Sequence, residues 1–156
     1  MQVFIVGSVL ETAQALDKKR LNKQIVECRQ ILNAIEGKTK AWANHPAAIQ
    51  YREHEDWLFR YLMCLENYYW AVYKKDVPEL TKPDLMEHAI KWSELASELR
   101  PAFHIEEFFT QMKRRLYTKD NNHYNRWKLL GESQENWYWS TKENRFIKYI
   151  NGKKLK

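Results

Sequence analysis

Apolar residues recur at intervals of three and four along most of this 156-residue chain, the spacing of one face of an α-helix. The clearest stripe begins after Arg20, and Gly37 follows it at the position of a left-handed helix cap. We therefore predict a helix from about residue 20 to residue 36. Its apolar stripe consists of Leu21, Ile25, Cys28, Leu32 and Ile35.

Two further helices are predicted on either side of this one. The stretch "SVLE" has the form of a capping box and predicts a short helix from about Val9 to Leu16. The stretch "NHPAA" predicts the start of a longer helix, with Asn44 as its N-cap and Pro46 in the first turn, that continues to about Tyr73. The residues expected on its buried side are Trp57, Tyr61, Leu65, Tyr68 and Val72.

The second half of the chain predicts two more helices and an irregular end. One helix begins at Thr81 or Asp84 and ends before Pro101, and another follows with Lys113, Arg114 and Arg115 turned outward. Their apolar sides carry Leu85, Ala89, Trp92, Ala96 and Leu99 in the first and Ile105, Phe108, Phe109, Met112 and Leu116 in the second. The segment "NWYWSTKENRFIKYING" predicts an irregular aromatic tail or a short hairpin. The expected fold class is all-α: one compact domain over residues 1–156, a bundle of about four to five helices.

Charge and aromatic content point to a polyanionic partner. Lys and Arg number 26 against 20 Asp and Glu, and the excess gathers in "DKKRLNK", "MKRRLYTK" and "NGKKLK". A clustered basic surface favours nucleic acid as the partner, and the 7 Trp, 9 Tyr and 6 Phe residues exceed what a small core needs.

Other classes of protein find little support in the sequence. No apolar run is long enough to cross a membrane, and the start lacks the pattern of a signal peptide. Cys28 and Cys64 fall in apolar helical positions and predict reduced core thiols, so we expect a cytoplasmic protein, associated with the nucleoid if it binds DNA. His104 lies near Glu106 and Glu107, but no spacing typical of metal ligands occurs, and neither a metal nor an organic cofactor is expected.

A single carboxylate, Glu27, lies among cations in the stretch "DKKRLNKQIVECRQIL". At 100° per residue, Arg20, Lys23, Glu27 and Gln30 fall on the side of the helix opposite the apolar stripe. From this spacing alone, a solvated face with an incidental Glu is the favoured interpretation. The alternative is a catalytic carboxylate that moves protons beside a sugar whose phosphates the cations bind.

Longer motifs resemble a known family. The stretches "LDKKRLNKQIVECRQIL", "WANHPAAIQYREHE", "YTKDNNHYNRW" and "WYWS" resemble the uncharacterised branch of the pyrimidine-dimer DNA glycosylase family, of the endonuclease V type. The resemblance implies an all-helical fold, a flipped nucleotide, cleavage of the glycosidic bond through a Schiff base, and strand scission by β-elimination. The family's essential acid is a Glu seven residues after a His or Arg, a spacing that Arg20 and Glu27 reproduce.

The nucleophile is not fixed by this resemblance. In dimer-cleaving members it is the α-amine of a Thr at position 2, exposed when the initiator Met is removed, whereas position 2 here is Gln. Either the Met1 α-amine serves, or Lys23 does, or the lyase step is absent. An α-amine suits imine chemistry better than an unperturbed Lys, because more of it is unprotonated near neutral pH.

The remaining predicted site residues are expected to contact DNA or a nucleotide. Basic side chains are predicted to bind the backbone, and aromatic side chains to stack on an unpaired base. The expected set is Arg20, Lys23, Gln24, Asn44, His45, Lys113, Arg114, Arg115, Lys119, Tyr124 and Trp139. The leading prediction is thus a DNA glycosylase, with possible AP-lyase activity, that acts on damaged or modified pyrimidines. The alternatives are a non-catalytic nucleotide or nucleic-acid binding module on the same fold, and a helical protein whose basic face binds an acidic protein.

Overall fold

The computed structural model describes residues 1–156 and is mostly helical. The α-helices are α1 (Val9–Ala15), α2 (Lys18–Ile35), α3 (Pro46–Tyr51), α4 (Glu55–Val72), α5 (Lys82–Ser97) and α6 (Glu106–Lys119). Short 3-10 helices occupy Arg52–His54, Glu79–Thr81 and Asn125–Leu130. The strands are β1 (Asn136–Ser140), β2 (Arg145–Ile150) and β3 (Lys153–Lys154). None of the helices combines the length and the apolar character that crossing a membrane requires.

The all-α prediction is wrong at the C-terminus, where an antiparallel sheet of order β1-β2-β3 forms. The β1–β2 hairpin pairs Tyr138 with Ile147 and Trp139 with Phe146. Directly paired residues project from the same face of the sheet, and Tyr138 and Ile147 are both buried, whereas the Trp139–Phe146 pair projects from the other face. The hairpin alternative is therefore the correct one, and the third strand was not predicted.

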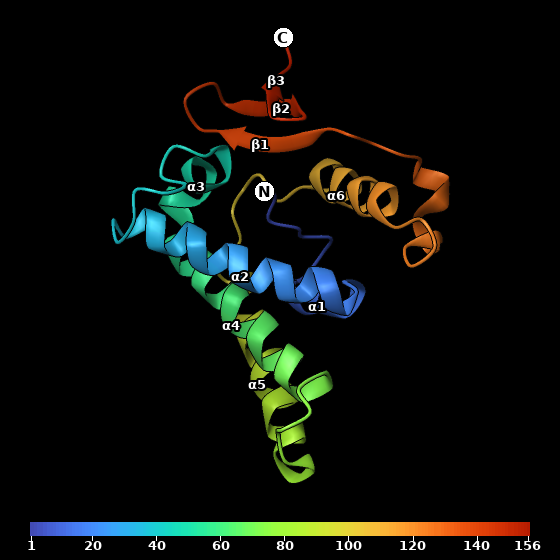
Figure 1. Cartoon of the computed structure of the whole chain (residues 1–156). Helices are drawn as coiled ribbons and strands as arrows, with labels where there is room; N and C mark the ends of the chain where they lie inside the picture. Colours follow the sequence, from blue (N-terminus) through green and yellow to red (C-terminus); the bar gives the residue numbers. More distant parts are fainter.

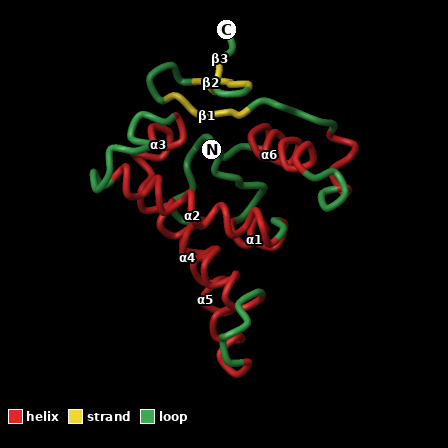
Figure 2. The backbone as a smooth tube through the Cα atoms, in the orientation of Figure 1, coloured by secondary structure: helices red, strands yellow, loops and turns green.

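The arrangement of the helices places the N-terminus inside the molecule (Figure 1). Helices α4 and α5 pack as an antiparallel pair that extends away from the body, and α2 crosses α4. The sheet covers the opposite end, and the first residues run as a loop between α2, α3, α6 and β1 (Figure 2). Val3 to Val6 are buried in the core, so this segment is held firmly although it forms no strand.

Helix boundaries differ from the prediction around residue 50. The expected continuous helix to Tyr73 divides into α3 and α4 at the 3-10 turn Arg52–His54. The division lets the Tyr51 ring stack on Trp57, with centroids 5.3 Å apart and an interplanar angle of 12°. The N-cap of α3 is His45 rather than Asn44, because the His45 side chain accepts from the backbone N–H of Ala47.

Several apolar residues that we expected inside are exposed because they lie at helix ends. Val72 is the last residue of α4, Leu99 lies beyond the end of α5, and Ile105 is the N-cap of α6. The predicted thiols Cys28 and Cys64 are buried and free, as expected. Helical periodicity thus located the helices. It did not predict which apolar residues at the helix ends are exposed, because that depends on how the helices pack.

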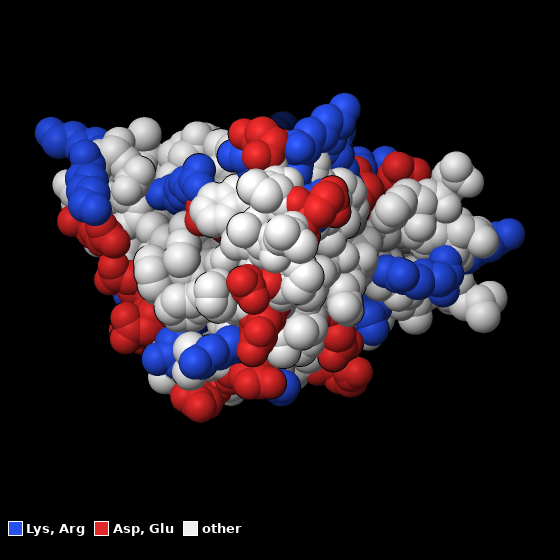
Figure 3. All heavy atoms as spheres, turned by 90° about the horizontal axis from the view of Figure 1, so that it is seen from below, with Lys and Arg blue, Asp and Glu red and all other residues white.

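Charge is mixed on the face that carries the α4–α5 pair. Seen from this end, acidic side chains run through the middle and along the lower edge, with basic side chains beside them (Figure 3). This face therefore offers no continuous positive surface for a polyanion.

Candidate active site

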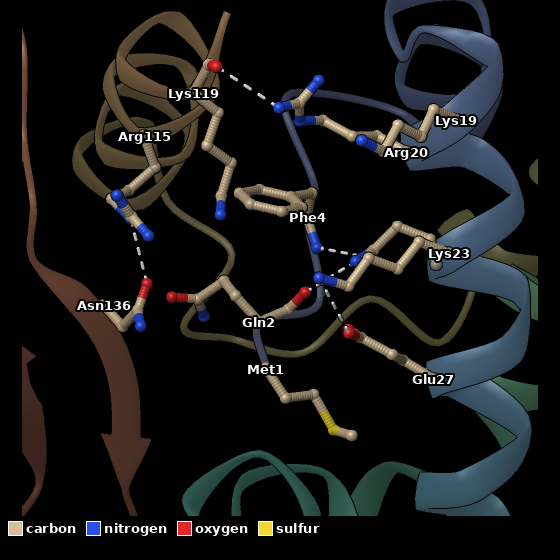
Figure 4. A pocket seen from close by; sticks show the side chains of 11 residues that line it. Met1, Gln2, Phe4, Lys19, Arg20, Lys23, Glu27, Arg115, Lys119 and Asn136 are labelled. Atoms are coloured by element: carbon tan, nitrogen blue, oxygen red, sulfur yellow. Dashed lines mark hydrogen bonds and ion pairs between the residues drawn. The ribbon is translucent and has the colours of Figure 1, made fainter. Parts of the chain in front are cut away.

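A cavity of about 200 Å³ lies between the N-terminal segment, α2, α6 and the start of β1 (Figure 4). Its lining contains five basic residues, one acidic residue and only two apolar ones. The lining residues are Met1, Gln2, Phe4, Lys19, Arg20, Lys23, Gln24, Glu27, Arg115, Lys119 and Asn136. Binding sites for drug-sized ligands usually enclose about 300 to 1,000 Å³. This cavity therefore suits part of a nucleotide, such as a sugar with one phosphate.

The chain start is fixed in this cavity by hydrogen bonds. The Gln2 side chain donates to the carbonyl of Trp137 (2.9 Å) and accepts from the Trp137 backbone N–H (3.2 Å). The Gln2 carbonyl accepts from Gln24 (2.8 Å), and the hydroxyl of Tyr138 donates to the carbonyl of Met1. Residue 2 is thus clamped on both sides, and the Met1 α-amine lies at the end of an immobilised segment.

Gln24 has a structural role in this arrangement. Its side chain is 4% exposed, accepts from the backbone N–H of Phe4 (2.9 Å) and from the hydroxyl of Tyr61 (2.9 Å), and donates to Gln2. All of these partners belong to the protein. The prediction that Gln24 contacts DNA therefore does not fit the structure, because its polar atoms are already occupied.

Glu27 lies in the cavity rather than on a solvated face. Its side chain is 16% exposed, and the Lys23 Nζ is 3.7 Å from its Oε1. Glu27 and Lys23 project from α2 toward the N-terminal segment, and Arg115 and Lys119 face them from α6 (Figure 4). The favoured solvated-face interpretation is wrong, because residues from three other elements enclose this side of α2.

The surroundings of the Met1 α-amine favour its unprotonated form. Burial lowers the pKa of the α-amine; Glu27 opposes that shift, and Lys23, Lys119 and Arg115 add to it, so that the net pKa is below its usual value. More of the amine is then unprotonated near neutral pH, which is the form that attacks carbon. Lys119 is a second candidate for the nucleophile, since burial and then the charges of Arg115 and Lys23 lower the pKa of its amine.

Arg20 is oriented by an ion pair with Asp17 and by a hydrogen bond to the backbone of α6. The Arg20 guanidinium is 3.3 Å from Asp17 Oδ1 and donates to the carbonyl of Lys119. Tyr124 is fully buried, and its hydroxyl donates to Asp17. Hydrogen bonds from Tyr124 and Arg20 outweigh the effect of burial and lower the pKa of Asp17. Tyr124 therefore holds Asp17 and Arg20 in place, and it is not available to stack on a base as we predicted.

The other predicted contacts divide between the cavity and its surroundings. Arg115 was expected to point outward, but it lines the cavity and donates to Asn136 (3.0 Å) and to the carbonyl of Ser133 (3.2 Å). Arg114 donates to the carbonyl of Glu132 outside the cavity, and Lys113 does not line it.

The Asn-His-Pro segment and Trp139 lie on another side of the N-terminus. Asn44 and Trp139 line a separate groove between α3 and the sheet, and the Trp139 ring stacks on Phe103. His45 caps α3, and burial, followed by the charge of the Met1 α-amine, lowers the pKa of His45.

Sequence reasoning missed several lining or supporting residues, among them Phe4, Asp17, Lys19 and Asn136. Lys19 belongs to the basic run that drew attention to α2, so its charge was a usable signal. Asn136 joins the cavity only through the fold of the C-terminal hairpin, and nothing local in the sequence indicates it. The chain contains no group of three or more His, Cys, Asp or Glu side chains placed to hold a metal ion.

Comparison with known proteins gives a match to a family model. No curated protein and no solved structure matches the chain. The matching family model covers the N-terminal segment and helices α1 to α4, and therefore includes Met1, Arg20, Lys23 and Glu27. Residues 1–75 match the model of the pyrimidine dimer DNA glycosylase family, the family that the sequence motifs resemble.

Proposed function

We propose that this protein is a DNA glycosylase for pyrimidine dimers that also cleaves the strand at the resulting abasic site. The Met1 α-amine is the nucleophile, and Glu27 transfers protons. The observation that carries the proposal is that the α-amine and the enclosed Glu27 carboxylate share one small cavity with five basic side chains. The family match over residues 1–75 supports DNA as the substrate.

In the first step the amine replaces the base. The unprotonated nitrogen of Met1 attacks C1′ of the deoxyribose, and the electron pair of the glycosidic bond leaves with the pyrimidine. The departing pyrimidine anion takes a proton from water, and the nitrogen, now positively charged, loses a proton to the Glu27 carboxylate. Glu27 then returns that proton to the ring oxygen O4′ as the C1′–O4′ bond opens, which produces a protonated imine.

In the second step the imine acts as an electron sink for strand scission. The Glu27 carboxylate takes a proton from C2′, the electron pair of that C–H bond forms the C2′–C3′ double bond, and the C3′–O bond breaks with release of the phosphate. Water then hydrolyses the imine and restores the amine. Arg115 and Lys119 line one side of the cavity, and Lys19 and Arg20 line the other. In this proposal they bind the flanking phosphates.

Borohydride trapping tests this proposal directly, because it reduces an imine to a stable amine link. The protein is incubated with abasic-site and ultraviolet-irradiated duplexes plus borohydride, and the adduct is mapped by mass spectrometry. We expect the adduct on Met1, and we expect it to disappear when two residues are added before Met1. The variants Lys23→Met and Lys119→Met should still be trapped at Met1.

Two outcomes contradict the proposal in different ways. An adduct on Lys23 or Lys119 overturns the assignment of the nucleophile but keeps the activity. Absence of both adduct and cleavage, with salt-sensitive DNA binding retained, supports a non-catalytic binding module instead.

A further inference from the structure

The loop between α2 and α3 (left in Figure 1) presents an aromatic side chain to solvent at an unusual backbone position. Trp42 is 42% exposed and has a φ of 67°. The left-handed region is costly for a bulky residue and favours Gly or Asn. A requirement of local folding would be met better by Gly or Asn, so the presence of Trp at this position suggests a role for its ring.

This loop is ordered by hydrogen bonds on both sides of Trp42. The backbone N–H of Ala43 donates to the carbonyl of Lys40, and that of His45 donates to the carbonyl of Trp42. Arg52 from the following 3-10 helix donates to the carbonyl of Ala43 (2.8 Å). The backbone is therefore held in the conformation that exposes the indole ring.

A continuous series of contacts joins Trp42 to the proposed nucleophile. The Trp42 ring meets the His45 ring edge-to-face, with centroids 5.3 Å apart, and His45 meets Tyr138 in the same way at 5.8 Å. The Tyr138 hydroxyl donates to the carbonyl of Met1. Trp42 does not line the cavity, but two ring contacts and one hydrogen bond connect it to the residue that carries the amine.

The cavity itself offers little surface on which a base can stack, because Phe4, the aromatic residue that lines it, is only 5% exposed. Its two apolar lining residues are Met1 and Phe4, and its volume suits a sugar and a phosphate. The aromatic residues nearby that we expected to stack on a base are committed elsewhere: Tyr124 is fully buried, and Trp139 stacks on Phe103. A base attached to a sugar in the cavity therefore needs an apolar plane outside it.

We propose that Trp42 is a base-stacking residue that supports a pyrimidine of the lesion outside the cavity while its sugar faces Glu27 and the Met1 amine. This inference rests on the proposed function and adds a residue that selects for the presence of the damaged base. Stacking on an exposed aromatic ring is tolerant of base identity, so Trp42 would contribute to binding of the lesion and not to the chemistry at C1′.

The test compares a substrate that has the base with one that lacks it. Trp42→Asn removes the ring and suits the left-handed backbone, whereas Trp42→Phe keeps an aromatic ring. The control is Phe59→Asn on α4, since Phe59 is 45% exposed and also meets one aromatic ring, Trp92, edge-to-face. Each protein is assayed for strand cleavage of ultraviolet-irradiated duplex and for borohydride trapping on an abasic duplex.

We expect Trp42→Asn to lower kcat/KM for the irradiated duplex by about 10- to 100-fold, and trapping on the abasic duplex by less than about threefold. Trp42→Phe should retain most activity on both substrates, and Phe59→Asn should behave like the parent. Equal losses on both substrates would overturn the inference and assign Trp42 to holding His45 and the N-terminus. No loss on either substrate would overturn it as well.

A binding measurement separates this inference from the proposed function. If the parent protein traps no abasic site, the proposed function fails, and the inference is decided by quenching of tryptophan fluorescence with a short irradiated oligonucleotide. Quenching present in the parent and lost in Trp42→Phe, with affinity lowered in Trp42→Asn, supports stacking on Trp42. Equal quenching and equal affinity in the parent and both variants would overturn it.

Discussion

Two glutamates on neighbouring helices, Glu27 and Glu66, show how similar residues serve different purposes in this protein. Both side chains are largely removed from solvent, with 16% exposed for Glu27 and 8% for Glu66. Glu66 on α4 forms a close ion pair with Arg29. Glu27 has the Lys23 ammonium 3.7 Å away, at the end of a side chain that is 65% exposed.

The difference lies in how far each carboxylate is committed to a partner. Arg29 and Glu27 are two positions apart on α2, so they project from different sides of the helix, and the Arg29–Glu66 pair lies away from the cavity. Glu66 is satisfied by a directed hydrogen bond from Arg29, whereas Glu27 faces open space and an amine. One carboxylate is thus closely paired with a cation, whereas the other faces the cavity.

The largest expected effect is a loss of cleavage activity when Glu27 is replaced. Glu27→Gln removes the group that transfers protons and should lower cleavage of the irradiated duplex by about 100- to 10,000-fold. Its midpoint of unfolding in urea should stay close to that of the parent, because the exposed Lys23 partner stabilises the fold only weakly. Glu66→Gln is the matched control: it should stay within about threefold of the parent in activity and be less stable. Equal losses of activity in the two variants would contradict the distinction.

The next effect concerns stability. Arg29→Met leaves the Glu66 carboxylate largely buried without its cation, and we expect unfolding to become easier by about 1 to 3 kcal/mol. The lower part of that range is favoured because the Arg29 side chain is 54% exposed, so water screens the pair. Urea denaturation followed by circular dichroism measures the change. The double variant Arg29→Met with Glu66→Met should recover part of the loss, and a further loss would show that the pair is not the cause.

A third effect distinguishes the site by its response to pH. The α-amine reacts only when unprotonated, so trapping on an abasic duplex should rise with pH through the pKa of the amine. Because burial lowers that pKa, the midpoint should lie below the value of about 8 usual for an α-amine. Glu27 opposes this shift, so in Glu27→Gln the amine should titrate at still lower pH. Competitive acetylation of the α-amine across a pH series, read by mass spectrometry, measures this without relying on turnover. A midpoint at or above the usual value would contradict the role of burial.

The sequence predicted the helices and drew attention to Glu27, but it did not predict the cavity in which Glu27 lies. Helical periodicity reports which face of α2 meets the core, and the buried stripe from Leu21 to Leu32 agrees with it. It does not report that the other face is enclosed by Met1, Arg115 and Asn136, which lie far away in the chain. For the same reason Tyr124 and Gln24 were assigned to DNA. Only the long-range contacts with Asp17 and Phe4 show that they act inside the protein.

The smallest effect is expected from Lys23, and its direction is informative. Lys23→Met removes a four-residue ion pair in which one side chain is mostly exposed, so stability should change by less than about 0.5 kcal/mol. The charge of Lys23 lowers the pKa of the Met1 α-amine, so its removal should move the titration of the amine to higher pH, opposite to the shift in Glu27→Gln. The same acetylation series measures both variants. A trapped adduct must persist in Lys23→Met if the α-amine is the nucleophile, and its loss would assign the reaction to Lys23. Opposite shifts in the two variants would show that the charges of Glu27 and Lys23 both act on the Met1 α-amine. Glu66 and Arg29 are not among the charges that shift the pKa of this amine.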